Sequence, residues 1–195
     1  MKKIICLLCL FSVVSLFSFA EKTESDAFSQ YPEALGFYGG RISGSGLTYH
    51  RWNDNKGYQI TAGVIYIPPL SNENSAIQLG DNMLDYVVGF ENAYVVYSED
   101  FTGWLSGLLS LFWGVNHRGY WPVETTDYET GAYTIHPYVP TITLGGGIGI
   151  EILLFKHFSI PFEIGYGVTY FPLEADPVDM FLVNLYPQAG FRYRY

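Results

Sequence analysis

Residues 142–170 read ITLGGGIGIEILLFKHFSIPFEIGYGVTY, and the alternation of side chains in this stretch decides the fold class. On both sides of the FKH segment, nearly every second residue is large and apolar, while most residues between them are Gly, Ser, Thr, Pro or Glu. A period of two is that of a β-strand with one apolar face and one small or polar face. The segment between the two runs is three residues long, so the apolar faces of both strands point to the same side.

Five further stretches show the same period of two. Alternation is clear in residues 58–66, 105–115 and 181–195. It is weaker in residues 85–97, where Asn92 interrupts it, and in residues 41–51, which are rich in Gly and Ser. A single-chain bacterial barrel normally has an even number of strands, so an eighth is expected, either within residues 27–40 or by subdivision of the long first segment. The sequence therefore predicts an all-β, antiparallel transmembrane β-barrel of about eight strands.

The minor face of these strands distinguishes a membrane barrel from a water-soluble one. A barrel in water would carry many Lys, Glu and Thr on its outer face, whereas here the minor face is dominated by Gly. The few charges within strands also fall on this face: Glu91, Glu151, Glu163, Arg192 and Arg194. Lipid would make charges there prohibitively costly, so we expect the minor face to line a polar lumen and the apolar face to meet lipid.

The first 20 residues have the plan of a cleaved signal peptide. Lys2 and Lys3 precede an apolar run that ends in Ser18-Phe19-Ala20, a small-residue cleavage site. We expect Glu21 to begin the mature chain and residues 21–195 to form a single barrel domain. The leader holds both cysteines, neither with a small residue before it, so we expect neither lipidation nor disulfides. Cleavage lowers the net charge from −9 to −11, which argues against binding nucleic acid.

Connector lengths predict the orientation of the barrel. Short connectors at residues 53–57, 98–103 and 155–157 alternate with long ones at 71–84, 117–138 and 172–180, the convention of periplasmic turns and outer loops. The long connectors are acidic, with Glu73, Asp81, Asp85, Glu124, Asp127, Glu129, Glu174, Asp176 and Asp179. These carboxylates form either an ordinary solvated surface or a site that recruits cations or a basic ligand.

Other residues that could carry chemistry have simpler structural explanations. His157 and Ser159 have the spacing of a barrel hydrolase, but a turn histidine beside a lumen hydroxyl explains both. The run of glycines at 145–149 lacks the Lys, Ser or Thr of a phosphate loop. The lumen charges allow either an internal salt-bridge network that fills a narrow barrel or a polar lining for ions. We expect the two arginines to meet Glu151 and Glu163.

The leader, the Gly-alternating strands and the ending Gly190-Phe191-Arg192-Tyr193-Arg194-Tyr195 together resemble small bacterial outer-membrane barrels of the OmpA/OmpX and OmpW-like class. The resemblance implies location in the bacterial outer membrane. It also implies that Phe191, Tyr193 and Tyr195 act as the C-terminal signal read by the barrel-assembly machinery. Members of this class include adhesins, narrow channels and lipid-modifying enzymes, so location is implied more strongly than activity.

Taken together, these patterns predict a non-enzymatic outer-membrane protein of structural or adhesin-like type, without cofactor or bound metal. The partners expected for it are outer-membrane lipid, the assembly machinery during insertion, and a host or environmental ligand at the acidic loops. A porin-like narrow pore for small solutes or ions is the alternative, and a lipid-modifying barrel enzyme is the third hypothesis.

Overall fold

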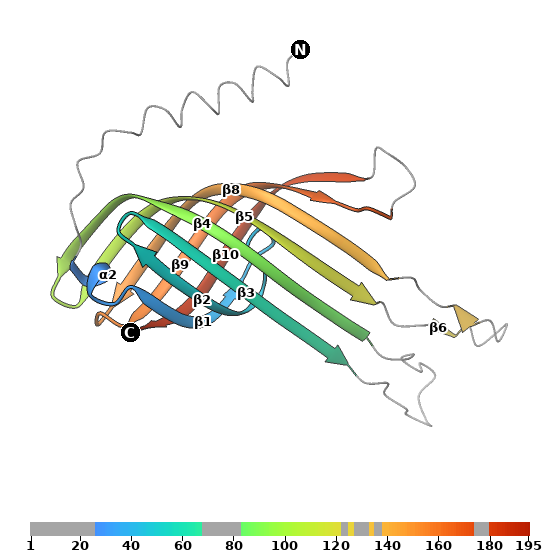
Figure 1. Cartoon of the computed structure of the whole chain (residues 1–195), viewed down its shortest axis with the longest axis horizontal. Coiled ribbons are helices and arrows are strands. Elements are labelled where there is room, and N and C mark those ends of the chain that lie inside the picture. Colours follow the sequence, from blue (N-terminus) through green and yellow to red (C-terminus); the bar gives the residue numbers. More distant parts are fainter. Residues whose placement is uncertain (1–25, 68–82, 122–124, 127–132, 135–137, 174–179) are drawn as a thin grey trace, which may run out of the picture.

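Eight antiparallel strands close into a barrel in the computed structural model of the chain (Figure 1). The structure describes residues 26–67, 83–121, 125–126, 133–134, 138–173 and 180–195. The barrel strands are β1 (Glu33–Gly39), β2 (Gly46–Asn53), β3 (Lys56–Ile67), β4 (Met83–Thr102), β5 (Leu105–Trp121), β8 (Val139–Leu154), β9 (Phe158–Tyr170) and β10 (Phe181–Arg194). Each strand pairs with its sequence neighbours in the barrel, and β10 closes the ring onto β1.

Three minor elements complete the described part. Helix α2 (Asp26–Gln30) precedes β1, and the two-residue strands β6 (Thr125–Thr126) and β7 (Tyr133–Thr134) pair with each other between β5 and β8. No helix among the described residues is long and apolar enough to cross a membrane.

The predicted all-β, antiparallel barrel is confirmed, including the eighth strand, which is β1 within residues 27–40. Helix α2 in the same stretch was not predicted. Three strand limits were wrong. Residues 40–45 do not belong to β2, which begins at Gly46; β4 continues to Thr102, so the turn there holds only residues 103–104; and β5 continues to Trp121 rather than ending before His117.

The alternation of burial follows the sequence pattern through the middle of the barrel, while the far ends of β3 and β10 are exposed on both faces. Along β9, Phe162 is 51% exposed, Glu163 is 9% exposed and Ile164 is 44% exposed. The large apolar residues thus form the outer face of the barrel, and the small and polar ones face the lumen. Asn92 sits at an outward position of β4, where its Nδ2 donates a hydrogen bond of 3.2 Å to the carbonyl of Gly57 on β3. That bond explains how a polar residue is accommodated in the apolar set.

The strands differ greatly in length, so the two ends of the barrel are unlike. One end of the barrel, which we name the near end, holds α2, the C-terminus and the tight turns at residues 54–55, 103–104 and 155–157 (Figure 1). We name the opposite end the far end. At the far end β4, with 20 residues, and β5, with 17, extend well beyond β1 and β2, with 7 and 8. The far rim is therefore low at β1 and β2 and high at β4 and β5.

Candidate functional site: a sealed lumen

The near end of the lumen is capped by the segment before β1. Phe28 of α2 is 5% exposed, and its ring lies 5.2 Å from the guanidinium carbon of Arg194. The Nη1 atom of Arg194 also donates hydrogen bonds to the carbonyls of Tyr31 and Pro32, at 3.2 and 3.4 Å. The last lumen-facing residue of β10 therefore ties the chain segment before β1 across the mouth of the barrel.

Directly inside this cap lies a buried ion cluster built around Glu151 of β8. Arg194 donates to its Oε1 from Nη2 at 2.5 Å and from Nε at 3.2 Å, and Arg192 Nη1 lies 3.9 Å from the same oxygen. Ser159 also donates to Oε1, and Trp52 Nε1 donates to Oε2 at 3.3 Å. The side chains of both arginines and of Glu151 are at most 5% exposed, so one carboxylate compensates two guanidinium groups away from solvent and the three charges sum to one positive charge.

A second polar network lies further along the lumen and joins four strands to residues 40–45. Tyr38 of β1 donates to Glu163 of β9, and Gln188 of β10 donates to the same carboxylate at 2.9 Å. Ser43 donates to Glu91 of β4, and Gln188 Nε2 lies 3.3 Å from the hydroxyl of Ser43. Because every member is held by at least one partner on another strand or in residues 40–45, the network crosslinks the interior.

The five charges predicted for the lumen all lie inside the barrel, but their pairing differs in part from the expectation. Glu151 meets both arginines, as expected. The expected ion pair between Glu163 and the arginines is wrong within the described residues: Glu163 binds Tyr38 and Gln188, while Arg192 donates to Gln59 of β3. The register explains this, because Glu163 pairs with Gln188 across β9 and β10, whereas Arg192 pairs with Ser159, four residues nearer the turn.

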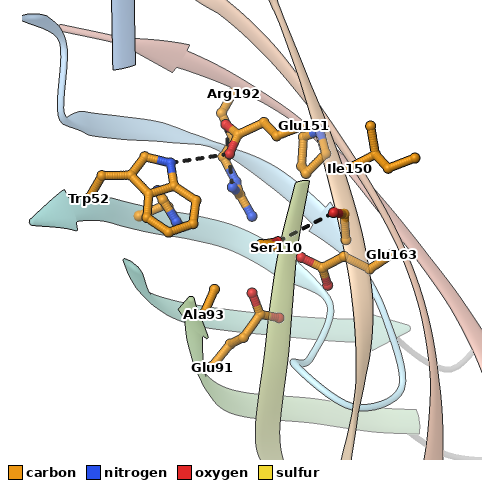
Figure 2. A pocket seen from close by; sticks show the side chains of 11 residues that line it. Trp52, Glu91, Ala93, Ser110, Ile150, Glu151, Glu163 and Arg192 are labelled. Atoms are coloured by element: carbon orange, nitrogen blue, oxygen red, sulfur yellow. Dashed lines mark hydrogen bonds and ion pairs between the residues drawn. The ribbon is translucent and has the colours of Figure 1, made fainter. Parts of the chain in front are cut away.

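Between the two networks remains one small cavity, shown with its lining residues in Figure 2. The volume in which the centre of a water molecule can lie is about 10 Å³, so the cavity has room for about one water. Two buried atoms of its lining, His50 Nδ1 and Arg192 Nε, have no hydrogen-bond partner among the described residues. The cavity thus suits a single polar molecule of water size and offers no continuous passage.

The middle of the lumen is filled by residues 40–45, which connect β1 to β2 by folding into the barrel. Ile42 and Ser43 are fully buried, and their backbone N–H groups both donate to Gln188 Oε1, at 2.8 and 3.0 Å. Asn116 of β5 donates to the carbonyls of Arg41 and Ile42. We name residues 40–45 the plug loop.

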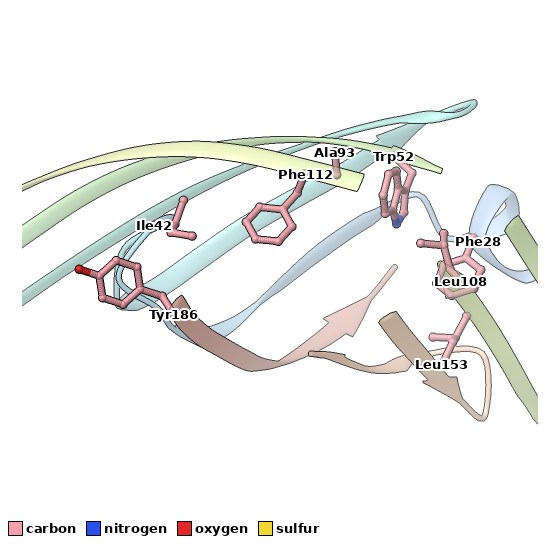
Figure 3. Packing of buried hydrophobic residues seen from close by; sticks show 8 residues of the cluster. All are labelled: Phe28, Ile42, Trp52, Ala93, Leu108, Phe112, Leu153 and Tyr186. Carbon is pink, nitrogen blue, oxygen red and sulfur yellow. The ribbon is translucent and has the colours of Figure 1, made fainter. Parts of the chain in front are cut away.

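The glycines of the minor face leave the space that the plug loop occupies. A Cβ atom on Gly145 would lie 2.9 Å from Ile42 Cδ1, and one on Gly114 would lie 2.9 Å from Ser43 Oγ. Gly44 has a φ of 87°, a left-handed conformation that glycine adopts without strain. Figure 3 shows Ile42 beside Phe112 and Tyr186, far from Phe28, Leu108 and Leu153 at the near end.

Sequence reasoning missed the plug loop because its residues were assigned to a strand. The available signal was the pair Gly44 and Gly46, both with positive φ, at a point where alternation was already weak. Some of the glycines on the minor face therefore accommodate an inserted loop.

The C-terminal aromatic residues and His157 lie outside this interior. Phe191, Tyr193 and Tyr195 point outward and are 50, 46 and 49% exposed. His157 Nδ1 is 2.8 Å from the carbonyl oxygen of Arg194, whereas Ser159 donates to Glu151, so the two do not form the hydrolase pair.

Of the acidic residues predicted for outer loops, Asp85 is a strand residue of β4 whose carboxylate forms a salt bridge with Arg118. The assignment of Asp85 to a loop was therefore wrong. The other acidic positions lie outside the described residues: Glu73, Asp81, Glu124, Asp127, Glu129, Glu174, Asp176 and Asp179. No group of three or more metal-ligating side chains occurs in the part of the chain that the structure describes.

No protein-family model and no curated protein matches the sequence, but several solved structures resemble the fold. The N-terminal β-barrel domain of Pseudomonas aeruginosa OprF matches with 9% identity and a TM-score of 0.49, over 85% of this chain and 98% of that one. Ail, the attachment invasion locus protein of Yersinia pestis, matches with 14% identity and a TM-score of 0.39, over 84% and 97% of the two chains. The structure of Ail in a phospholipid bilayer nanodisc matches with 12% identity and a TM-score of 0.32, over 84% and 99%.

The printed descriptions of these neighbours name a β-barrel domain and an outer membrane protein. The likeness is one of fold, and the arguments that follow rest on the geometry of this chain.

Proposed function

We propose that the protein is an integral outer-membrane barrel of structural or surface-interaction type whose lumen is permanently sealed. Its membrane placement is supported chiefly by the outer face. Large apolar side chains on every barrel strand are exposed there, among them Phe37, Leu47, Val64, Val88, Ile148, Phe162 and Val183, each at least 50%. A monomer in water rarely exposes an apolar surface that encircles it, whereas lipid requires one.

The near end is assigned to the periplasm. Its turns are short, as periplasmic turns are, and the C-terminal aromatics Phe191, Tyr193 and Tyr195 lie outward there, available to the barrel-assembly machinery. The far end, with β6 and β7 and the long connectors, then faces outward. Export through a signal peptide cleaved before Glu21 is part of this proposal.

The sealed lumen argues against the porin-like alternative. An open pore requires a continuous water path, but α2, the ion cluster of Glu151 and the plug loop close the interior at three successive levels. The enzyme hypothesis is also weakened, because Ser159 is buried against Glu151 and does not contact His157. The surfaces left to carry a function are the outer face of the barrel and the far-end loops.

Contact with the environment through the acidic far-end connectors is the surface activity that we propose. The chain carries 19 acidic against 10 basic residues, so its field favours a basic ligand such as a cationic peptide or a lysine-rich protein surface. Adhesin-like behaviour of this kind would require no moving part in the barrel.

Planar-bilayer recordings test the sealed lumen. The wild-type protein should show no stepwise conductance. In a matched variant, residues 40–44 are replaced by Asn-Gly, which keeps the Tyr38–Gly46 register and removes the plug. That variant is expected to conduct, provided that heat-shifted gel migration shows a folded barrel. Conductance steps from the wild type would contradict the proposal and favour the pore.

The surface role is tested by binding of whole cells to a cationic peptide and to its charge-neutral analogue. Cells with the protein should bind the cationic form more strongly than cells without it. Replacement of Glu124, Asp127 and Glu129 by amides should reduce the difference, while Glu33→Gln at the opposite end should not. Equal binding to both peptides would exclude the acidic loops as the contact.

A further inference from the structure

Positive charge on the outer face of the barrel wall is confined to one hairpin. Among the described strand residues whose side chains point outward, only Arg51 of β2 and Lys56 of β3 are Lys or Arg. Arg51 forms an ion pair of 3.3 Å with Glu33, its partner in the register of β1 and β2. We name Glu33, Arg51 and Lys56 the rim triad, because all three lie where their strands reach the near end.

The members of the rim triad are close enough to act on one small group. Lys56 lies two residues before Tyr58, the partner of Arg51 in the register, so the two cations are diagonal neighbours on the outer face. Such neighbours lie roughly 7–8 Å apart, a distance that two long side chains can bridge. The side chains of Arg51 and Glu33 are 46 and 32% exposed, and Lys56 is also exposed. Both signs of charge are thus accessible from outside at one place.

Aromatic rings surround the rim triad. The rings of Tyr49 and Tyr58, outward residues of β2 and β3, have centroids 6.2 Å apart. Lys56 Nζ lies 5.6 Å from the ring centroid of Tyr94, which is 43% exposed on β4. Tyrosines, with an apolar ring and a polar hydroxyl, are typical of the boundary between hydrocarbon and water. The triad therefore lies at the level of the lipid head groups if the barrel spans the membrane as proposed.

The outer face becomes apolar from the rim triad toward the far end. Leu47 on β2 and Ile60 on β3 are 64 and 49% exposed, and Phe90 of β4 lies beside Ile60. Because the near end is assigned to the periplasm, these residues lie nearer the middle of the membrane than the triad does. A phospholipid of the periplasmic leaflet has the same order, with its head group at the rim and its acyl chains toward the middle.

The mixture of charges selects among head groups. Arg51 and Lys56 can both donate to phosphate oxygens. A carboxylate accepts several hydrogen bonds, so Glu33 can accept from an ammonium group while it is paired with Arg51. A quaternary ammonium has no N–H to donate. A head group without a cation would bring its phosphate close to Glu33 and the exposed turn residue Asp54, which have the same sign of charge.

We propose that the rim triad binds one phospholipid of the periplasmic leaflet whose head group carries a phosphate and a primary ammonium, as that of phosphatidylethanolamine does. The phosphate lies on Arg51 and Lys56, the ammonium lies on Glu33, and an acyl chain lies along Leu47 and Ile60. This inference rests on the membrane placement and orientation and goes beyond the proposed function, because it names a lipid that the barrel holds.

Native mass spectrometry of the mature protein released from micelles tests this selection, with phosphatidylethanolamine, phosphatidylcholine and phosphatidylglycerol offered in equal amounts. Wild type should retain one phosphatidylethanolamine in preference to the other two. Glu33→Gln should weaken that retention by up to about fivefold, the scale of one partly exposed charge contact, and should increase retention of phosphatidylglycerol. The matched control is Glu99→Gln, because Glu99 is a near-end carboxylate on β4 that accepts a hydrogen bond of 2.5 Å from Tyr97; it should change neither.

Lys56→Gln tests the contact with the phosphate. It should weaken retention of all three lipids to a similar degree, because each of them has the phosphate. Lys156→Gln makes the same charge change in the near-end turn at residues 155–157 and should leave retention unchanged.

No preference in wild type, a preference for phosphatidylglycerol, or equal changes in each variant and its control would overturn the site. Membrane placement is measured separately with a nitroxide on a cysteine at Leu47 in nanodiscs, since the mature chain, expressed from Glu21, has no competing thiol. Oxygen, which concentrates in lipid, should relax this label, and a water-soluble nickel chelate should not. Relaxation by nickel would overturn the membrane placement itself, so the two proposals fail separately.

Discussion

The ion pair of Glu151 and Arg194 offers the sharpest test of how the lumen is held together. Its two nitrogen–oxygen contacts, at 2.5 and 3.2 Å, join β8 to β10, two strands that do not pair directly. The side chains are 5 and 0% exposed, so neither charge is hydrated when its partner is removed. We predict that Glu151→Gln and Arg194→Gln both lower the free energy of unfolding, and that the two effects are not additive.

The magnitudes follow from what each variant leaves behind. Glu151→Gln leaves two buried arginines without their counter-charge. It should lower the free energy of unfolding by about 4 kcal/mol, within the range for breaking a buried pair. Arg194→Gln leaves Glu151 with Ser159, Trp52 and Arg192, the last at 3.9 Å, so about 3 kcal/mol is expected. The double variant should cost about 5 kcal/mol rather than the sum, because the second replacement removes a charge that was already unpaired.

Urea unfolding in lipid vesicles, followed by tryptophan fluorescence, measures these differences, provided that the dependence on urea is the same in all variants. The control cycle uses Glu33→Gln and Arg51→Gln, an ion pair of 3.3 Å whose side chains are 32 and 46% exposed. Each control variant should cost at most about 1 kcal/mol. Strict additivity in the Glu151 cycle would refute the pairing and indicate a hydrated lumen.

Three further changes test the cap, the plug loop and the orientation. Phe28→Ala should lower the free energy of unfolding by about 3 kcal/mol, because it empties the contact with Arg194; an unchanged unfolding midpoint would show that α2 does not cap the lumen. Gly44→Ala should cost roughly 1–3 kcal/mol for its positive φ, whereas Gly103→Ala, with open space around the added Cβ, should cost little. A cysteine at Thr126 should react with an impermeant maleimide on intact cells and one at Asn55 should not; the opposite result would invert the barrel.

Most of the wall was predictable because its physics is local in sequence. A strand between lipid and a packed lumen requires alternation at every position, so residues 142–170 carried a complete signal and gave the observed faces and turn. The wrong predictions concern the ends of strands, where a strand can continue beyond the part of the wall that faces lipid. β5, for example, runs to Trp121 through His117 and Arg118, because the latter is satisfied by Asp85 on the neighbouring strand.

The lumen was predictable in content but only partly in contacts. Parity alone places Glu151, Glu163, Arg192 and Arg194 inside, since one step along a strand reverses the face. Which of them meet depends on the stagger between strands, and the stagger was unknown for β9 and β10. Gln59 and Tyr38, which bind Arg192 and Glu163, come from strands distant in sequence, and no local pattern marks them as partners.

The sealed lumen and the short length of β1 and β2 have a common cause in the course of residues 40–45. If these six residues continued the hairpin of β1 and β2, they would lengthen both strands, with Gly40 opposite Gln188 on one side and Ser45 opposite Val64 on the other. Instead Gly44 and Gly46 turn the chain inward, Ile42 and Ser43 occupy the space left by lumen glycines, and their N–H groups bind the side chain of Gln188. The chain is too short to do both, so closing the lumen at this level necessarily leaves β1 and β2 short. A variant that frees the loop from Gln188 should therefore change conductance, because the N–H groups of Ile42 and Ser43 lose the acceptor that holds the loop in the lumen.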